Sequence, residues 1–331
     1  MRHFTIALLA AALAARAQSP QTDANRSNRF SAPTLGFIAG PTTNQITPIL
    51  GIPGAARLGD PLLLPNTVTS VHIAPGHAYA LIEQGAGGPI CVAILRGAAL
   101  GESIIPLPIA GAIHQADLLA FSPTGSSALL YSQQMNRFQV VTGLPGSPSV
   151  SGDFPNASVG GAVSRLAISD DGKALLMADD TGAVSFLAPD SGPVPVYQSP
   201  NMSALIFLAK THDAVVCDDR LNTVVLLGSV TNGPVVKTLT SGSLISQPEA
   251  AASSADGKTI LVASTSQHLV FSIDPASGAI SAHPVANNPS VLDSAGIRDV
   301  FLLTRAGDST HWIFVWQRTT PSTFFVGGSS K

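Results

Sequence analysis

Two pairs of adjacent aspartates are the residues of this sequence whose type and spacing best suit chemistry. Asp179-Asp180 and Asp218-Asp219 each follow a short apolar run, at equivalent positions of an internal repeat. Carboxylates from neighbouring repeats would suit a hard cation such as Ca²⁺, which takes about six to eight oxygen ligands. Asp is also a common turn residue, and that preference alone explains the recurrence. Asp179 and Asp218 are therefore only weak metal candidates, and no cofactor is predicted beyond this calcium.

Other polar residues are expected to share one face with these aspartates. If each repeat begins with a hairpin, the loops between second and third strands lie on the same face as the connections between repeats. The candidate binding residues of this rim are Glu83, His114, Asp179, Asp180, Asp218, Asp219, Arg220, Glu249 and Arg298. The rim is polar and somewhat acidic, which suits recognition of a partner or a ligand.

The remaining reactive side chains form no known catalytic or metal motif. The eight histidines are scattered, and the sequence has no Gly-x-Gly-x-x-Gly, Walker A or Gly-x-Ser-x-Gly motif. Cys91 and Cys217 lie in separate apolar segments, which predicts buried cysteines with no disulfide between them. Trp312 and Trp316 are expected to pack in the core, the alternative being a carbohydrate platform.

The elements that position these residues belong to a repeat that occurs six times. Each copy is an apolar run, a turn that usually carries Gly or Asp, and a second apolar run, as in Leu166–Ile168, Ser169–Gly172 and Ala174–Met177. The turn markers stand at positions 76, 125, 172, 213, 257 and 307, so successive markers lie 41 to 50 residues apart. This interval is typical of a four-stranded blade of a β-propeller. Frequent Pro and Gly and little helical periodicity argue against an α/β enzyme.

Two of these turns also resemble a known family. The Ser-x-Asp-Gly turn of Ser169–Gly172 and the Ile-Asp-Pro-Ala-Ser-Gly segment of Ile273–Gly278 are similar to repeats of bacterial YVTN-type propellers. The resemblance covers roughly residues 34 to 327. It implies a propeller fold and almost nothing about function, because such repeats encode turns and not chemistry.

The predicted fold is all-β, a single β-propeller domain over residues 34–327. The repeats favour six four-stranded blades, and seven are allowed. Residues 35–54 resemble the second half of a blade, while the last repeat shows mainly a first half. We therefore expect the N-terminal strands to close the ring by completing the final blade; in the competing interpretation Thr323–Val326 supplies the closing strand. Residues 18–33 are expected to be a flexible leader and 328–331 a tail.

The first 17 residues have the pattern of a secretory signal peptide. Arg2 precedes an apolar run from Phe4 to Leu13, and Ala15-Arg16-Ala17 fits a cleavage site. This predicts an exported protein, periplasmic or extracellular, with no membrane span after removal of the signal. The 17 basic and 20 acidic residues give a formal net charge of −3, which disfavours nucleic acid as a partner.

Two functional classes stay open from the sequence. The first is an exported, non-catalytic propeller that acts as a binding or protein-interaction scaffold for an unknown protein, peptide or glycan. The alternative is a propeller hydrolase or lactonase with a central polar pocket that holds Ca²⁺. An enzyme needs titratable groups that converge on one point. The acidic residues are instead spread over equivalent loops, so binding is favoured and the question of catalysis is left open.

Overall fold

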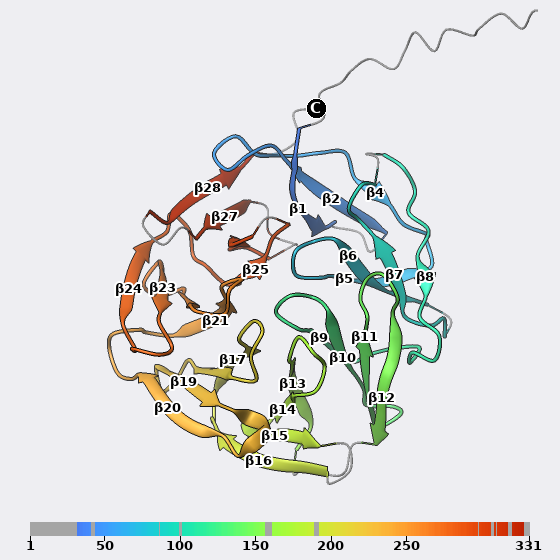
Figure 1. Cartoon of the computed structure of the whole chain (residues 1–331). Helices are drawn as coiled ribbons and strands as arrows, with labels where there is room; N and C mark the ends of the chain where they lie inside the picture. The colour runs from blue at the N-terminus through green and yellow to red at the C-terminus, as the bar shows by residue number, and fades with distance from the viewer. Residues whose placement is uncertain are drawn as a thin grey trace, which may run out of the picture. The chain divides into compact units, whose positions relative to one another are not determined.

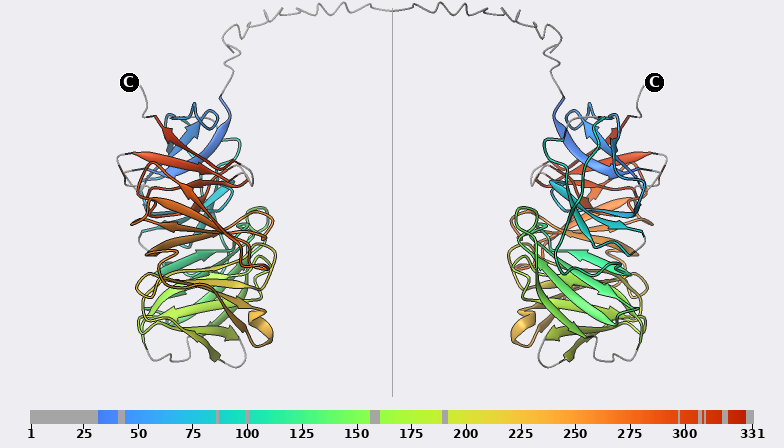
Figure 2. Two further views of the ribbon diagram at one scale, coloured as in Figure 1. Left: turned by 90° about the vertical axis from the view of Figure 1, so that its left-hand side faces the viewer. Right: turned by 90° about the vertical axis from the view of Figure 1, so that its right-hand side faces the viewer.

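The computed structural model describes residues 32–40, 44–85, 87–98, 101–155, 161–188, 192–296, 298–305, 308, 310–316 and 320–327. The segment expected to be a signal peptide and most of the expected leader lie outside these residues, as does the expected 328–331 tail. Residues 33–331 form one compact unit. Its strands make seven four-stranded antiparallel sheets, and Figure 1 shows them following one another around a ring, with the last sheet beside the first. The fold is therefore an all-β, seven-bladed propeller, seen edge-on in Figure 2.

In every blade the first strand is innermost; blades 2 to 7 are meanders, and in blade 1 the short third and fourth strands both pair with the second (Figure 1). Blades 1 to 4 contain β1 (Thr34–Ala39), β2 (Gln45–Leu50), β3 (Arg57–Leu58) and β4 (Leu62–Leu63); β5 (Val68–Ile73), β6 (Tyr79–Gln84), β7 (Cys91–Ile94) and β8 (Leu107–Pro108); β9 (Leu118–Phe121), β10 (Ser127–Ser132), β11 (Arg137–Thr142) and β12 (Ser149–Pro155); β13 (Val163–Ile168), β14 (Leu175–Asp179), β15 (Ala183–Ala188) and β16 (Gly192–Gln198).

Blades 5 to 7 contain β17 (Met202–Phe207), β18 (Ala214–Asp218), β19 (Thr223–Gly228) and β20 (Val235–Thr240); β21 (Pro248–Ser253), β22 (Ile260–Ser264), β23 (Leu269–Ile273) and β24 (Ile280–Pro284); β25 (Asp293–Ser294), β26 (Val300–Leu302), β27 (His311–Val315) and β28 (Ser322–Val326). The described helical structure is one short 3₁₀ turn, η1 (Val230–Asn232). Within the described ranges no helix has the length and apolar character needed to span a membrane.

In blades 3, 4 and 6 a buried serine satisfies backbone groups of the turn between first and second strands. In blade 4 the Ser169 hydroxyl donates to Asp171 at 2.7 Å and accepts from the backbone N–H of Ala174 at 2.9 Å. Gly172 supplies the positive φ, +72°, that the reversal requires. Blade 6 repeats the arrangement around Ser254. The Ser-x-Asp-Gly pattern is thus a turn code, as the sequence indicated.

The sequence favoured six blades and allowed seven, and the structure has seven. The additional blade is N-terminal: β1 and β2 are its first hairpin, and β3 and β4 both pair with β2. The prediction that N-terminal strands complete the final blade is therefore wrong, because blade 7 supplies all four of its own strands, with β28 outermost. The hairpin counted as the sixth repeat joins β26 to β27, the second and third strands. The innermost strand β25 has only two residues, which hid it from the repeat pattern.

The hydrophobic core is divided among the junctions between blades. Seven clusters of buried side chains occur, and each joins two consecutive blades. The cluster that closes the ring packs Leu35 and Ile49 of blade 1 against Val300 and Ile313 of blade 7. A parallel bridge between Arg57 and Gly327 adds backbone pairing at the same junction. Closure therefore depends on packing between complete blades, since no blade is shared by the two ends of the chain.

A hydrogen bond also crosses every junction, and in each case at least one partner lies in a turn between first and second strands. We call this set the turn belt. From the junction of blades 1 and 2 onward its bonds are Phe37 N to His77 Nδ1 (2.7 Å), Tyr79 Oη to Gly125 O (2.6 Å), Thr124 Oγ1 to Asp170 Oδ1 (2.6 Å), Lys210 N to Asp170 Oδ2 (2.8 Å), Ala209 N to Ser253 Oγ (3.0 Å), Ala255 N to Asp299 Oδ1 (2.8 Å) and Gly296 N to Leu35 O (2.9 Å).

Two members of the turn belt connect three blades, Asp170 of blade 4 and His77 at the closure of the ring. His77 belongs to blade 2, its Nδ1 accepts from Phe37 N–H in blade 1, and its ring also hydrogen-bonds to the backbone of Ser294 in blade 7. Burial disfavours the imidazolium and outweighs the Ser294 bond, so the pKa of His77 falls from 6.5 to about 4. The ring is therefore neutral, and its lone pair on Nδ1 is committed to the backbone of blade 1.

We predict that His77 makes stability depend on pH. The unfolded chain binds this proton near pH 6.5 and the folded chain only near pH 4. The contribution of neutral His77 to the free energy of unfolding is complete above pH 6.5. About 3 kcal/mol of stability is lost as the pH falls from 6.5 to 4. In His77→Asn the amide oxygen replaces Nδ1, Asn tolerates the φ of +50°, and titration is absent. Urea unfolding at pH 7.5 and pH 4 should show a smaller loss in this variant than in wild type or in His114→Asn. Equal losses would contradict the assignment.

We also predict that Gly36 must lack a side chain for the ring to close. A Cβ at this position would lie 2.8 Å from His77 Nδ1 and 3.3 Å from Gly296 N. Gly36→Ala should therefore lower the free energy of unfolding by about 1–3 kcal/mol, as overpacking does. Gly146→Ala is the matched control, since nothing lies within 4 Å of a Cβ there. Indistinguishable denaturation midpoints for the two variants would show that the junction accommodates the methyl group.

Candidate functional site

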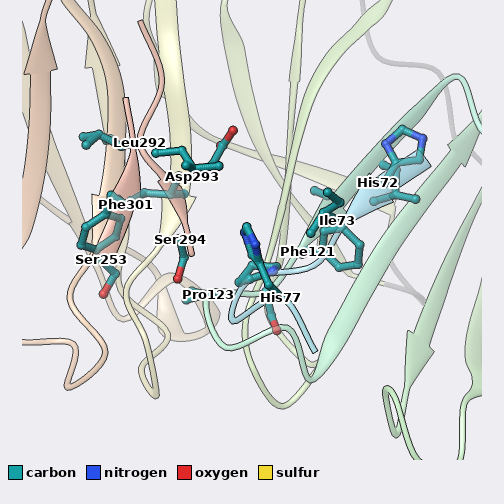
Figure 3. A pocket seen from close by; sticks show the side chains of 18 of the residues that line it. His72, Ile73, His77, Phe121, Pro123, Ser253, Leu292, Asp293, Ser294 and Phe301 are labelled. Carbon is teal, nitrogen blue, oxygen red and sulfur yellow. The ribbon is translucent and has the colours of Figure 1, made fainter. Parts of the chain in front are cut away.

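A central channel runs through the ring and is the main candidate site. Its cavity has a volume of about 460 Å³ and is lined by the first strands of all seven blades. Polar and apolar surface contribute about equally to the wall, and its apolar side chains include Ile38, Ile73, Phe121, Leu166, Ile206, Leu292 and Phe301. Figure 3 shows His72 and Phe121 on one wall, Asp293 and Leu292 on the other, and the His77 ring between the walls. The fold thus provides a passage in which apolar side chains stand beside polar groups.

The end of the channel where the first strands begin is polar. A second cavity of about 410 Å³ lies there, and it shares Leu166, Ile206 and Asp293 with the first, so the two are continuous. We call this end the channel mouth; its polar side chains are Ser164, Arg165, Ser203, Glu249, Ser290, Asp293 and Arg305. The mouth therefore brings two guanidinium groups and two carboxylates to one end of the passage.

β-Bulges position three of the mouth side chains. Strands β13, β17 and β21 each shift register by one residue near their start, and the extra residues are Ser164, Ser203 and Glu249. A bulge bends the strand and re-aims the side chain at that point. The serines are then fixed by hydrogen bonds, Ser164 Oγ to Ala178 O and Ser203 Oγ to Pro248 O. The arrangement follows from the backbone and not from the turn code.

Charged groups at the mouth are only partly paired. Arg305 lies 3.7 Å from Glu249, and Arg165 donates through Nε to Met202 O at 3.1 Å. Asp293 has no side-chain hydrogen bond to the described residues. Water reaches its carboxylate from the channel, yet protein surrounds the channel, and this burial raises the pKa of Asp293 against the opposing effect of Arg305. Asp293 is thus an incompletely solvated acceptor that faces the channel.

His72 is the histidine of the channel wall that contacts both a hydroxyl and a carboxylate. Ser70 Oγ lies 2.8 Å from its Nε2, and Glu83 Oε1 lies 3.3 Å from the same atom. A Ser-His-acid relay uses the two ring nitrogens for different partners, one to take the proton and the other to be oriented. Because both groups meet Nε2, this trio lacks the geometry of a relay and can serve only as a polar patch on the wall.

The two weak metal candidates are occupied within their own turns. Asp218 is buried, and its two oxygens accept four hydrogen bonds, from Ser199, Asn201, Arg220 and Leu221 at 2.8–3.1 Å. Asp179 Oδ1 accepts from Thr181 and Ala183; burial opposes its ionisation, but these bonds outweigh it and hold its pKa below the usual value. Within the described ranges no group of three or more His, Cys, Asp or Glu side chains gathers as a metal site.

The other predicted rim residues have separate environments. Asp180 accepts from Ala162 N at 3.1 Å, Asp219 and Arg220 lie on the β18–β19 turn, and His114 is exposed on the connection from β8 to β9. Glu249 reaches the channel mouth, and Glu83 reaches the channel wall through His72. The rim is therefore a scattered set, from which the structure brings only these two glutamates to the channel.

The sequence analysis placed Arg298 with the connections between blades, and the structure does not. This residue lies between β25 and β26, a turn between first and second strands, and not on a connection between blades. In an antiparallel meander these turns and the blade connections lie at opposite ends of the sheet. The error follows from the two-residue strand β25, which displaced the repeat alignment in blade 7 by one strand.

The sequence interpretation also missed Arg165, Asp293 and Arg305. Arg165 and Asp293 stand within inner strands, where a search of the loops does not find them, and Arg305 follows β26, the second strand of blade 7. The signal was a charge inside an otherwise apolar inner strand, as in the segment Val163–Ile168. The cysteine prediction is confirmed: Cys91 and Cys217 are buried and free. Trp312 and Trp316 pack against the core between blades 6 and 7.

No protein-family model matches the chain, and no curated protein sequence matches it. Several solved structures match the chain. Hydrazine synthase of Kuenenia stuttgartiensis is 14% identical with a TM-score of 0.53 over 91% of this chain and 98% of that one. A protein of unknown function from Desulfotomaculum acetoxidans is 12% identical, with a TM-score of 0.56 over 90% and 100% of the chains. A Bacteroides uniformis protein provisionally described as a 6-phosphogluconolactonase is 14% identical, with a TM-score of 0.51 over 77% and 82%.

We predict that Asp218 acts as a turn cap and not as a calcium ligand. Asp218→Asn places an amide NH₂ against hydrogen-bond donors and should lower the free energy of unfolding by about 1–3 kcal/mol. The neighbouring Asp219→Asn is the control and should have little effect. Addition of EDTA or CaCl₂ should leave the thermal midpoint of wild type and both variants unchanged, because a ligand of the folded state would raise it by mass action. A midpoint that Ca²⁺ raises in wild type but not in Asp218→Asn would overturn this assignment.

Proposed function

We propose that this propeller is a non-catalytic binding protein that holds its ligand in the central channel. The likeness to solved structures extends to the fold alone, so the proposal depends on the channel itself. The observation that carries it is the dispersal of the titratable groups. His72 and Glu83 belong to blade 2, Arg165 to blade 4, and Asp293 and Arg305 to blade 7.

Polar groups that are dispersed among apolar side chains around a passage are typical of a binding site. A small-molecule site is concave and mostly apolar, with a few polar groups that fix the ligand's orientation. A combined mouth and channel of this size suits a small molecule or the end of a peptide. Catalysis needs a base within hydrogen-bond reach of the group it activates. The Ser70, His72 and Glu83 contacts converge on one nitrogen, and His77 uses its ring to hold three blades.

The alternative is a hydrolase or lactonase, and one observation favours it. Asp293 combines a raised pKa with an open position in the channel, a combination often found in general acids and bases. We also propose that the protein is exported to the periplasm or beyond the cell; the support for this is the signal-like pattern of residues 1–17.

The experiment that tests binding against catalysis uses native mass spectrometry of residues 18–331 with a fixed panel: leucine, leucyl-leucine, glucose, succinate and glucono-δ-lactone. We expect at least one compound to bind with 1:1 stoichiometry and to be recovered unchanged, and Ala251→Trp, which fills the channel, to abolish that binding. Phe325→Trp on the outer strand β28 is the control. Lactone hydrolysis faster than buffer and lost in Asp293→Asn would replace the proposal by the lactonase. Binding that survives Ala251→Trp would place it elsewhere.

A further inference from the structure

The charges that face the channel mouth balance one another. Arg165 and Arg305 contribute two positive groups, and Glu249 and Asp293 contribute two negative groups. A site that selected an anion or a cation would carry an excess of the opposite charge. A balanced mouth instead complements a ligand that carries both charges and no net charge.

Asp293 indicates where the positive end of such a ligand would bind. Its carboxylate accepts no hydrogen bond from a side chain or backbone in the described ranges, although a carboxylate can accept several. It lies in the wall shared by the mouth and the channel, beside Leu292 (Figure 3). An ammonium group would donate to this carboxylate in place of water and would favour its ionised form.

The two guanidinium groups provide the complementary half of the site. Arg165 uses Nε for Met202 O, and its terminal nitrogens have no partner among the residues described. Arg305 approaches Glu249 only to 3.7 Å, with both side chains partly exposed, so this pair is weak. Guanidinium groups with free N–H donors suit a carboxylate, which they bind through two parallel hydrogen bonds.

The passage beyond the mouth suits an apolar group. Leu166, Leu205, Ile206 and Leu292 line both cavities, directly inside the polar mouth. An aliphatic side chain that enters this region would leave water and gain packing contacts. We propose that the channel binds a small zwitterion with an apolar side chain, either a free aliphatic amino acid or a short aliphatic peptide, with its ammonium on Asp293 and its carboxylate on the guanidinium groups of the mouth.

This assignment rests on the proposed binding function, and calorimetric titration of residues 18–331 at pH 7.5 tests it. The probes are L-leucine and L-leucyl-L-leucine, with N-acetyl-L-leucine (no ammonium) and L-leucinamide (no carboxylate) as comparisons. We expect one of the zwitterions to bind at least about tenfold more tightly than either comparison. Each comparison compound lacks one of the two charged groups and therefore loses its charge-assisted hydrogen bonds to the protein. The zwitterion that binds more tightly identifies the source as a free amino acid or a peptide.

Substitutions test which side chains bind the ammonium end and the carboxylate end of the ligand. Asp293→Asn should weaken the zwitterion about tenfold or more and leave N-acetyl-L-leucine unchanged, while Arg165→Gln or Arg305→Gln should weaken the zwitterion and leave L-leucinamide unchanged. Asp60→Asn, on the exposed β3–β4 connection, is the matched control. Equal affinity for N-acetyl-L-leucine and L-leucine would overturn the assignment. Channel binding of glucose or succinate without either zwitterion would overturn it while the binding function stands, and a panel with no bound compound would overturn both.

Discussion

The turn belt is the interaction on which the rest of this structure depends. Buried strands satisfy their own backbone groups within a blade, but nothing in a four-stranded meander fixes its position against the next blade. Apolar packing between blades is strong and non-directional, so it resists separation more than sliding. The hydrogen bonds at each junction add direction, because their geometry is satisfied at only one position of a blade relative to the next. The ring therefore has a defined register as well as a core.

Blade 1 shows how that register is reached without a shared blade. Many rings are closed by combining strands from the two ends of a chain, and here each end supplies a whole blade. His77 compensates: from blade 2 it bonds to Phe37 of blade 1 and to the backbone of Ser294 in blade 7. Gly36 leaves the space that this contact needs. A neutral imidazole suits the position because it both donates and accepts, which neither a lysine nor a carboxylate does.

The sequence predicted the parts of the fold that local chemistry determines. Ser169, Asp171 and Gly172 make a turn from their own side chains and φ preference, so their recurrence revealed the blades. Blade 1 and the strand β25 were missed because they lack this code: the Ala39–Gln45 reversal has no Ser-x-Asp-Gly, and β25 is two residues long. His77 joins segments that are far apart in the sequence, and no local pattern marks such a contact. In the sequence it was therefore indistinguishable from the other seven histidines.

The same distinction explains the candidate site. Asp179 and Asp218 attracted attention because they recur, and they recur because the turns need them. A residue that recurs at equivalent positions stabilises the fold of each repeat. A single ligand in the channel has no such symmetry, so it is contacted by residues that differ between blades. Arg165, Glu249 and Asp293 occupy inner strands of three different blades, and each breaks an apolar lining. In a propeller, departures from the repeat therefore carry more information about binding than the repeat itself.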